Sequence, residues 1–315
     1  MSQIHPTATI SPDAIIGKNV EIGPYAMIGP RVQIGDGCFI HHNVTLNGNT
    51  TLGEKVEIGA YSVIGDPCRI LDFQEGKIDL MDGQVRIGNG SVLESNVMIK
   101  GFTTMGEGNL IGSYTTIGFP PQAKRGSTKP TYVEIGNHNQ LREYVSIQSG
   151  TVDGSGHTII GNYNLIMVYA HLAHDTKIGD YCALSNSTNL AGHVEFGSYV
   201  VTGGFACFHQ YTRVGDYAMA GGMSGVYQDL APYMLATGHR ASLYGINLVG
   251  LQRNGFTSEE IQQAQQIYNI FFQSNLAPVI ARREVQNKVP DGPVLRRFVE
   301  FIEKSRRGLV TREVG

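Results

Sequence analysis

The chain has 315 residues and a formal net charge of −3, and only 16% of its residues are charged. It contains 40 glycines and no tryptophan, a mix that disfavours a long amphipathic helical protein and favours a turn-rich β architecture. The charge gives no sign of nucleic-acid binding, no C-x-x-C pair suggests a zinc or redox motif, and no apolar run approaches the roughly 20 residues of a membrane span. The N-terminal segment MSQIHPTATISPD lacks the basic and apolar regions of a signal peptide, so we expect a cytoplasmic protein.

An apolar residue recurs every six positions from Ile4 onward. The frame continues in four runs, over residues 4–64, 87–117, 135–147 and 160–226. Of its 32 positions only Thr202 is not apolar, and glycine follows many of them, as in Ile22-Gly23. A period of six fits a triangular coil with one short strand and one inward side chain per side, so that 18 residues complete a coil. Such prisms are left-handed, and the sequence therefore predicts an all-β left-handed parallel β-helix in which glycine supplies the positive φ of the corners.

Three segments break the frame, at residues 65–86, 118–134 and 152–159. Because the register resumes after each one, we expect these segments to leave the prism as loops, and loops on a rigid scaffold often carry binding groups. We expect the β-helix with its three insertions to occupy residues 1–230 and a connector to occupy residues 231–256.

A C-terminal helical domain is expected over residues 257–315, beginning at a capping box formed by Thr257 and Glu260. Two apolar stripes at helical spacing follow, formed by Ile261, Ala264, Tyr268, Phe271 and Phe272, and by Leu295, Phe298, Val299 and Ile302. Residues 282–315 carry nine Lys/Arg and five Asp/Glu, a net charge of +4 (9 − 5). Two explanations account for this charge about equally well. The tail either docks an acidic partner protein or is an ordinary solvent-exposed helix face.

Four of the ten histidines gather within three coils of the last run. His174, His193 and His209 belong to hexads whose frame residues are 18 positions apart, and His171 lies at the adjoining corner. Imidazole titrates near neutrality and takes a proton from a hydroxyl or amine nucleophile, so His174 is a candidate general base.

Two further residues complete this candidate site. Asp175 is a candidate orienting carboxylate, although in a strand it would point away from His174. Gly192, which follows His174 by 18 positions, is a candidate oxyanion donor through its backbone N–H. Three histidines on one edge also suggest a metal site, as in the hexapeptide-repeat carbonic anhydrases. However, zinc needs ligands about 2 Å from one point, and positions stacked roughly 4.8 Å apart would need help from a neighbouring chain, so we expect no metal and no cofactor.

Several ordered motifs resemble the UDP-N-acetylglucosamine O-acyltransferases, which catalyse the first step of lipid A biosynthesis. They are Ala170-His-Leu-Ala-His-Asp175, Asn189-Leu-Ala-Gly-His193, His209-Gln210, Gly221-Gly-Met-Ser-Gly225, Asp229-Leu-Ala-Pro-Tyr233, Gly245-Ile-Asn247 and Arg307-Gly-Leu309. The resemblance extends from about Glu134 to the end of the chain, whereas the N-terminal repeats add only general hexapeptide similarity.

The resemblance implies a homotrimer that moves a (3-hydroxy)acyl chain from acyl carrier protein to the 3-position of a UDP-sugar, UDP-N-acetylglucosamine or a close analogue. It implies that His174 is the base and that Gly192 is the oxyanion donor. Gly222 falls where the family gauges acyl-chain length, and glycine there leaves room for a long chain. The other residues expected to bind substrate are His171, His193, His209, Gln210, Gln122, Arg240, Asn247 and Arg253.

Three positions depart from the family pattern in the nucleotide site. Val249 stands where the family usually has glutamate, Asn254 where it has arginine, and Ala123 where it often has aspartate. Valine cannot accept a hydrogen bond through its side chain, and asparagine lacks the charged fork that binds a diphosphate.

Two explanations follow from these departures. Either the first insertion, together with Lys124, Arg125 and Arg240, restores the lost contacts, or the acceptor is a related nucleotide sugar. The alternatives to O-acylation are N-acylation of a UDP-amino sugar and a non-catalytic or metal-binding trimeric scaffold.

Overall fold

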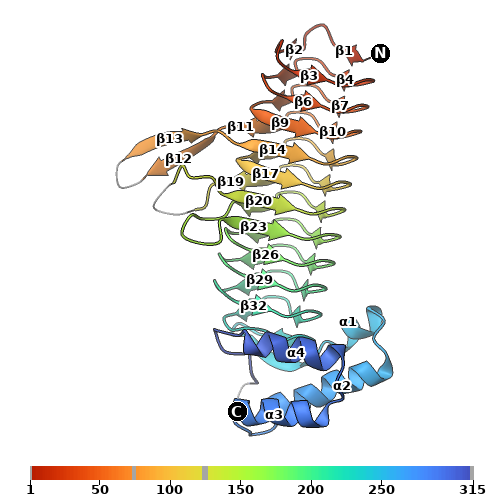
Figure 1. Cartoon of the computed structure of the whole chain (residues 1–315), viewed down its shortest axis with the longest axis vertical. Coiled ribbons are helices and arrows are strands. Elements are labelled where there is room, and N and C mark those ends of the chain that lie inside the picture. Colours follow the sequence, from red (N-terminus) through yellow and green to blue (C-terminus); the bar gives the residue numbers. More distant parts are fainter. Residues whose placement is uncertain (1, 73–75, 123–126, 313–315) are drawn as a thin grey trace. The chain divides into compact units, whose positions relative to one another are not determined.

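The computed structural model describes residues 2–72, 76–122 and 127–312, and the chain divides into two compact units, residues 1–180 and 181–315. Each unit contains its own stack of triangular coils, and the second also contains the helices (Figure 1). The boundaries predicted at residues 230 and 256 both fall within the second unit, and the expected connector between them contains two strands and a short helix. None of the helices in the described part of the chain is long and apolar enough to cross a membrane.

In the first unit, three parallel sheets form the three faces of the prism, and each coil contributes one strand to each sheet. The first sheet contains β1 (Gln3–Ile4), β4 (Glu21–Ile22), β7 (Phe39–Ile40), β10 (Glu57–Ile58), β15 (Val92–Leu93), β18 (Leu110–Ile111), β21 (Gln140–Leu141) and β24 (Leu165–Ile166). The second contains β2 (Thr9–Ile10), β5 (Met27–Ile28), β8 (Thr45–Leu46), β11 (Val63–Asp66), β16 (Met98–Lys100), β19 (Thr116–Phe119), β22 (Ser146–Gln148) and β25 (His171–Leu172). The third contains β3 (Ile15–Ile16), β6 (Gln33–Ile34), β9 (Asn49–Leu52), β14 (Gln84–Ile87), β17 (Phe102–Met105), β20 (Tyr132–Ile135), β23 (His157–Ile160) and β26 (Lys177–Ile178).

The second unit continues the same arrangement with fewer coils. One sheet contains β27 (Ala183–Leu184), β30 (Val201–Thr202), β33 (Met219–Ala220), β35 (Met234–Thr237) and β36 (Ser242–Ile246). Another contains β28 (Asn189–Leu190), β31 (Cys207–Phe208) and β34 (Gly225–Val226). The last contains β29 (Glu195–Phe196) and β32 (Arg213–Val214). β35 pairs with the coil above it in parallel and with β36 in antiparallel fashion, so this hairpin closes the stack.

The strand register follows the six-residue frame. Ile4 pairs with Ile22, and Ile58 pairs with Ile40, each one uninterrupted coil apart in sequence. The frame side chains point inward and most are completely buried, and burying each such side chain stabilises the fold by roughly 1.5–3 kcal/mol. The exception, Thr202, is also buried, because its hydroxyl hydrogen-bonds the Ser185 N–H at 3.1 Å and the Thr188 hydroxyl at 2.7 Å. The predicted left-handed β-helix is therefore confirmed.

The prediction that glycine supplies the positive φ of the corners holds at a minority of them. Gly37 and Gly90 adopt it, at 70° and 63°, but most corner residues with positive φ are not glycine, such as Tyr25 at 59° and Asn43 at 55°. Gly23 is needed for close approach instead, because a Cβ there would lie 2.8 Å from the backbone nitrogen of His42 on the next coil. Glycine thus allows adjacent coils to stack, and the corner residues accept the left-handed conformation.

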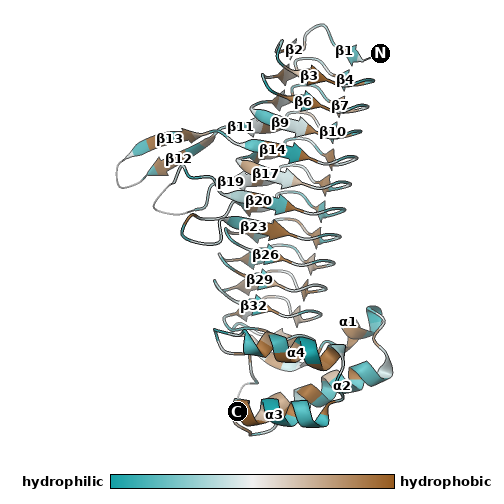
Figure 2. Cartoon of the chain, in the orientation of Figure 1, coloured by the Kyte–Doolittle hydropathy of each residue, from teal (hydrophilic) through white to brown (hydrophobic). Residues whose placement is uncertain are grey.

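All three frame breaks leave the prism at the corner between the second and third sheets of the first unit (Figure 1). The first is not a simple loop but an antiparallel hairpin of β12 (Cys68–Asp72) and β13 (Lys77–Met81). Cys68, Ile70 and Met81 bury one face of this hairpin against Phe102. The hairpin carries apolar stretches along both strands (Figure 2), and its side chains of Leu71, Ile78 and Leu80 are exposed.

The helices of the second unit are α1 (Leu248–Arg253), α2 (Ser258–Tyr268), α3 (Pro278–Lys288) and α4 (Pro293–Glu303), with a π-helical turn, η1 (Asn269–Gln273), after α2. The predicted capping box is present, with the Thr257 N–H donating to Glu260 at 2.8 Å and the Glu260 N–H donating to the Thr257 hydroxyl at 3.2 Å. Phe298 is completely buried in α4, as its stripe predicts. The sequence analysis missed α1 and α3, and Pro278 begins α3 as its first residue, where a missing N–H costs nothing.

Candidate active site

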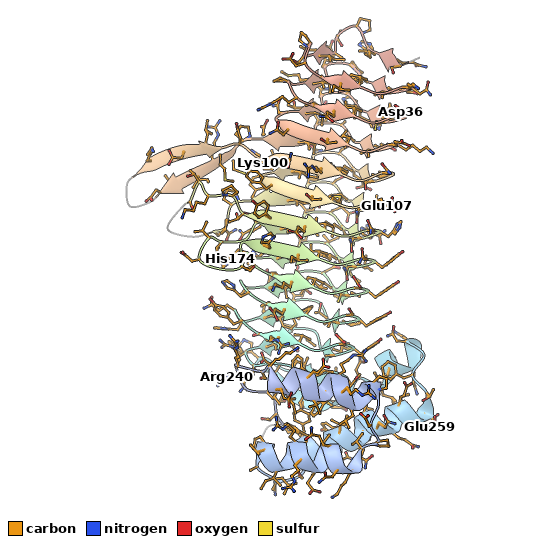
Figure 3. All side chains as sticks on the ribbon, in the orientation of Figure 1. Asp36, Lys100, Glu107, His174, Arg240 and Glu259 are labelled. Atoms are coloured by element: carbon orange, nitrogen blue, oxygen red, sulfur yellow. The ribbon has the colours of Figure 1, made fainter. Side chains whose placement is uncertain are left out.

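The corner that follows β25 holds three of the predicted site residues. His171 lies in the strand, and His174 and Asp175 lie in the turn that follows it. In Figure 3, His174 lies on the edge of the first unit from which the insertions project. Asp175 has a φ of 59°, so it is the corner residue of its coil and not a strand residue.

His174 and Asp175 form a close histidine–carboxylate pair. The distance between His174 Nδ1 and Asp175 Oδ2 is 2.9 Å, and the side chains are 25% and 0% exposed respectively. The expectation that Asp175 would point away from its neighbour is wrong, because it assumed strand geometry at a corner. Since a carboxylate only accepts hydrogen bonds, Nδ1 must carry the proton, which leaves Nε2 as the basic atom of a neutral ring.

The Asp175 carboxylate is enclosed by Thr151 and by the third insertion, which begins at the next residue. Its Oδ2 accepts from the Thr151 N–H at 3.0 Å and from the Thr151 hydroxyl at 2.6 Å. Its Oδ1 accepts from the Ser155 hydroxyl and the Gly156 N–H, both at 2.9 Å. The Asp175 N–H donates in turn to the buried Thr158 hydroxyl at 2.9 Å. These donors hold a buried charge in one orientation, and the sequence analysis did not foresee any of them.

His171 precedes this pair on the outward side of β25 and is half-buried. Burial lowers the pKa of the His171 imidazole, because the charged form loses its water. A neutral His171 can both donate and accept a hydrogen bond, which suits the substrate-binding role predicted for it.

Two other predicted residues lie in the second unit, and each is next to a tyrosine one coil later. His193 has a φ of 62° and stacks on Tyr211, with ring centroids 4.4 Å apart. His209 is exposed and lies 5.7 Å from the ring of Tyr227. The sequence analysis missed both tyrosines, although each follows its histidine by 18 positions and the same register predicts the contact.

Tyr227 also joins His209 to two arginines. The guanidinium carbon of Arg240 lies 5.9 Å from its ring centroid, and Arg307 Nε donates to its backbone carbonyl at 3.1 Å. This group, which consists of His209, Tyr227, Arg240 and Arg307, concentrates positive charge at one place in the second unit. It is a suitable surface for an anionic substrate group.

Gly192 and Gly222 occupy turns of the second unit, and Gln210 is exposed beside His209. Gly192 is buried, and its carbonyl accepts from the Tyr211 N–H at 3.2 Å. Gly222 is exposed, and a Cβ there would have the Gly204 carbonyl as its nearest contact, at 3.5 Å. The site therefore tolerates alanine, whereas a longer side chain at residue 222 would extend into the solvent-facing space.

The connector residues differ in how free their side chains are. Asn247 is 5% exposed, caps α1 by accepting from the Gly250 N–H at 3.2 Å, and donates to the Tyr217 carbonyl at 2.9 Å. Arg253 is exposed in the last turn of α1, and Val249 is 54% exposed. Arg253 is thus available to a ligand, whereas Asn247 would have to give up its present bonds.

The second insertion contributes one described site residue, Gln122, which is exposed. Ala123, Lys124 and Arg125 lie outside the described residues.

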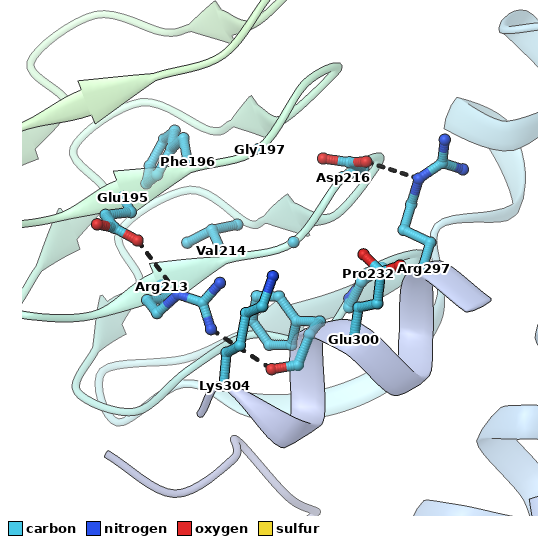
Figure 4. Close-up of a pocket in the computed structure, with 12 residues that line it drawn as sticks. Glu195, Phe196, Gly197, Arg213, Val214, Asp216, Pro232, Arg297, Glu300 and Lys304 are labelled. Atoms are coloured by element: carbon cyan, nitrogen blue, oxygen red, sulfur yellow. Dashed lines mark hydrogen bonds and ion pairs between the residues drawn. The ribbon is translucent and has the colours of Figure 1, made fainter. Parts of the chain in front are cut away.

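A separate cavity of 220 Å³ lies between β29, β32 and α4 in the second unit (Figure 4). Arg213 binds Glu195 at 3.3 Å, and Arg297 of α4 binds Asp216 at 2.6 Å. Arg297 also donates to the Tyr233 hydroxyl at 3.2 Å, and burial raises the pKa of Tyr233 to about 12. None of the predicted site residues lines this cavity, and the Arg297–Asp216 ion pair attaches the last helix to the coils.

Comparison with known proteins identifies the family of the chain. The profile described as "Udp N-acetylglucosamine O-acyltransferase; Domain 2" matches residues 229–310, and the bacterial transferase hexapeptide repeat matches residues 13–48, 31–66 and 157–192. An acyl-[acyl-carrier-protein]–UDP-N-acetylglucosamine O-acyltransferase of Thermodesulfovibrio yellowstonii is 44% identical over 234 residues, which cover 74% of this chain and 91% of that protein. The chain belongs to the UDP-N-acetylglucosamine O-acyltransferase family.

Solved structures of the family extend the likeness to nearly the whole chain. The UDP-N-acetylglucosamine acyltransferase of Arabidopsis is 33% identical, with a TM-score of 0.73, and the match covers 98% of this chain and 100% of that one. The enzyme from Moraxella catarrhalis is 32% identical, with a TM-score of 0.72 and coverage of 98% and 99%. The resemblance stated from the sequence is confirmed, and the chain is an acyltransferase.

Proposed function

We propose that this chain transfers a (3-hydroxy)acyl group from acyl carrier protein to the 3-hydroxyl of UDP-N-acetylglucosamine or a close analogue. The observation that carries the proposal is the His174–Asp175 pair, at 2.9 Å, in a member of this family. The names of the relatives include both the carrier-bound donor and the nucleotide sugar. Family membership favours O-acylation over N-acylation of a UDP-amino sugar and over a non-catalytic or metal-binding scaffold.

In the proposed reaction, Nε2 of His174 takes the proton of the sugar hydroxyl as its oxygen attacks the thioester carbonyl. The resulting oxyanion accepts a hydrogen bond from the N–H of Gly192. The tetrahedral intermediate then collapses, the carbon–sulfur bond breaks, and the imidazolium returns its proton to the departing thiolate. The products are the O-acyl sugar nucleotide and the free thiol of the carrier.

Asp175 supports the imidazolium that forms during attack. Its carboxylate is surrounded by hydrogen-bond donors, so as a carboxylate it offers a fixed negative charge next to Nδ1 without rearrangement. We propose Asp175 as a catalytic residue in this orienting sense, with His171, His193, His209 and Gln210 as substrate-binding residues.

We propose that the nucleotide part of the acceptor binds Gln122, Arg240, Asn247 and Arg253, and that Gly222 leaves room for the acyl chain. Arg240 and Arg253 are exposed cations, which suits a diphosphate. Val249 and Asn254 depart from the family pattern, and Asn254 donates its amide to the Gly250 carbonyl at 2.8 Å. Because these two residues differ from the family pattern, the proposal includes a closely related nucleotide sugar as an alternative acceptor.

We further propose that the enzyme works as a homotrimer in the cytoplasm, with acyl carrier protein as its partner. The trimer rests on the family resemblance, because a single prism edge that carries His174 supplies only one wall of a site. Light scattering should give three copies per particle, and an active monomer would contradict the proposal.

An assay with acyl carrier protein loaded with 3-hydroxyacyl chains tests the reaction and the acceptor together. UDP-N-acetylglucosamine and its 3-amino analogue should be supplied as competing acceptors, with mass spectrometry of the nucleotide products. The proposal predicts an ester product that alkali hydrolyses, formed mainly from UDP-N-acetylglucosamine. An alkali-stable amide formed preferentially from the amino sugar would support the N-acyltransferase, and no product from either sugar would contradict both.

A further inference from the structure

The segment of residues 151–156, which begins one residue before the third insertion and continues into it, directs several hydrogen-bond donors at one side chain, Asp175. Both oxygens of that carboxylate are engaged, and its side chain is 0% exposed. The Ser155 hydroxyl also lies 3.0 Å from the His157 carbonyl. Since one hydroxyl has one proton, it favours the charged acceptor, Asp175, at 2.9 Å.

Thr151 has a special place among these donors. Its hydroxyl and the Nδ1–H of His174 share the same oxygen, Asp175 Oδ2, at 2.6 Å and 2.9 Å. The Thr151 N–H reaches that oxygen as well, at 3.0 Å. A carboxylate oxygen held from this side cannot turn away from His174 without losing two hydrogen bonds, so Thr151 fixes the direction in which the imidazole points.

Gly154 packs directly against the hydrogen bond between Thr151 and Asp175. A Cβ at this residue would lie 2.5 Å from Asp175 Oδ2 and 2.6 Å from the Thr151 hydroxyl oxygen. Its φ lies outside the left-handed region, so alanine is compatible with its backbone, and only the contact with the carboxylate excludes a side chain. The loop therefore has both a donor and a steric wall shaped for this carboxylate.

We infer that Thr151 is a positioning residue for the catalytic base, and that the third insertion exists to hold Asp175 and, through it, His174. The inference rests on the proposed function of His174 as the base. It gives the insertion a role in catalysis that does not involve contact with substrate. Hydrogen-bond partners behind a metal-binding histidine typically contribute about 10- to 100-fold to activity, and we expect an effect of the same order here.

The test compares Thr151→Val, which keeps the shape and the N–H but removes the hydroxyl, with Thr151→Ser, which restores it. Thr151→Val should lower kcat by about 10- to 100-fold with an unchanged KM for the acceptor, and Thr151→Ser should recover most of the loss. Gly154→Ala should lower kcat at least as much as Thr151→Val. Thr103→Val is the matched control, because Thr103 is completely buried in the same unit and its hydroxyl donates to the Lys100 carbonyl at 2.8 Å.

A readout that does not depend on turnover separates the two proposals. Proton NMR of the full-length protein should show a strongly deshielded Nδ1–H that disappears in His174→Ala. That resonance should shift in Thr151→Val and stay in place in Thr103→Val. An unmoved resonance, or a loss of kcat that Thr103→Val matches at equal thermal destabilisation, would overturn the role of Thr151. If the resonance shifts but His174→Ala remains fully active, the positioning contact stands and the proposed function fails.

Discussion

Two histidine–carboxylate pairs in the first unit have nearly the same length and very different surroundings. His174 Nδ1 lies 2.9 Å from Asp175, and His157 Nδ1 lies 2.7 Å from Glu134. The side chains of the second pair are 39% and 50% exposed, whereas Asp175 is 0% exposed and accepts from both Thr151 and Gly156. An exposed pair contributes little and reorients freely, so a short distance alone does not identify a catalytic pair. The number of hydrogen-bond donors that hold the carboxylate distinguishes the candidate catalytic pair from the exposed one.

The largest expected effect is the loss of the base. His174→Ala should reduce kcat by about 10²–10⁴ without unfolding the coils, since general-base catalysis typically contributes that much. His157→Ala removes the same side chain from the exposed pair and should leave turnover near that of the wild type. Steady-state assays with both purified variants check this, and near-normal turnover of His174→Ala would remove His174 from the mechanism.

A smaller effect is expected at the last helix and the residues after it. Lys304 and Arg306 are exposed, and Lys304→Glu combined with Arg306→Glu should lower kcat/KM for acyl carrier protein by roughly tenfold at low salt through weaker electrostatic steering. Lys18→Glu combined with Lys55→Glu, at two exposed residues of the first coils, is the charge-matched control. Because the Debye length falls to about 3 Å at 1 M salt, the difference from wild type should disappear there. A salt-independent kcat/KM of the wild type would show that the positive charge is incidental.

The smallest expected effect concerns stability and pH. Burial lowers the pKa of His171, so between the ordinary histidine value of about 6.5 and its lower folded value the unfolded chain binds more protons. The free energy of unfolding should therefore fall as the pH decreases through this window. Denaturant titrations at several pH values should show a shallower decrease for His171→Asn than for wild type. His5→Asn, at an exposed position, is the control, and an equal pH dependence in all three proteins would refute the assignment.

The sequence predicted the parts of the fold that follow the repeat. One inward side chain every six residues fixes both the strand and its register. The same rule could have predicted the stacking of His193 on Tyr211, which the sequence analysis missed. The rule does not apply outside the frame, which is why the hairpin of β12 and β13 was predicted only as a loop. The rule also assigned the wrong role to Gly23, which allows the next coil to approach closely and does not supply a positive φ. That approach depends on backbone positions that a linear pattern does not contain.

The candidate site was predicted in part for a similar reason. His174 and Gly192 follow from the register and the family motifs, but the environment of Asp175 does not. Its donors come from an insertion 19 to 24 residues earlier in the chain, and its contact with His174 depends on a φ of 59° at the corner. The sequence names the residue types of a site, whereas the irregular segment that orients them is visible only in three dimensions.

The central claim is that a buried, firmly held carboxylate makes His174 the working base. Single-turnover measurement of acyl transfer from carrier-bound donor, with Asp175→Asn and Glu134→Gln compared under saturating acceptor, tests it most directly. Both changes replace a histidine-bound carboxylate by its neutral amide. The account predicts that Asp175→Asn slows the chemical step by about 10²–10⁴ while Glu134→Gln leaves it unchanged. Equal rates in the two variants would contradict it.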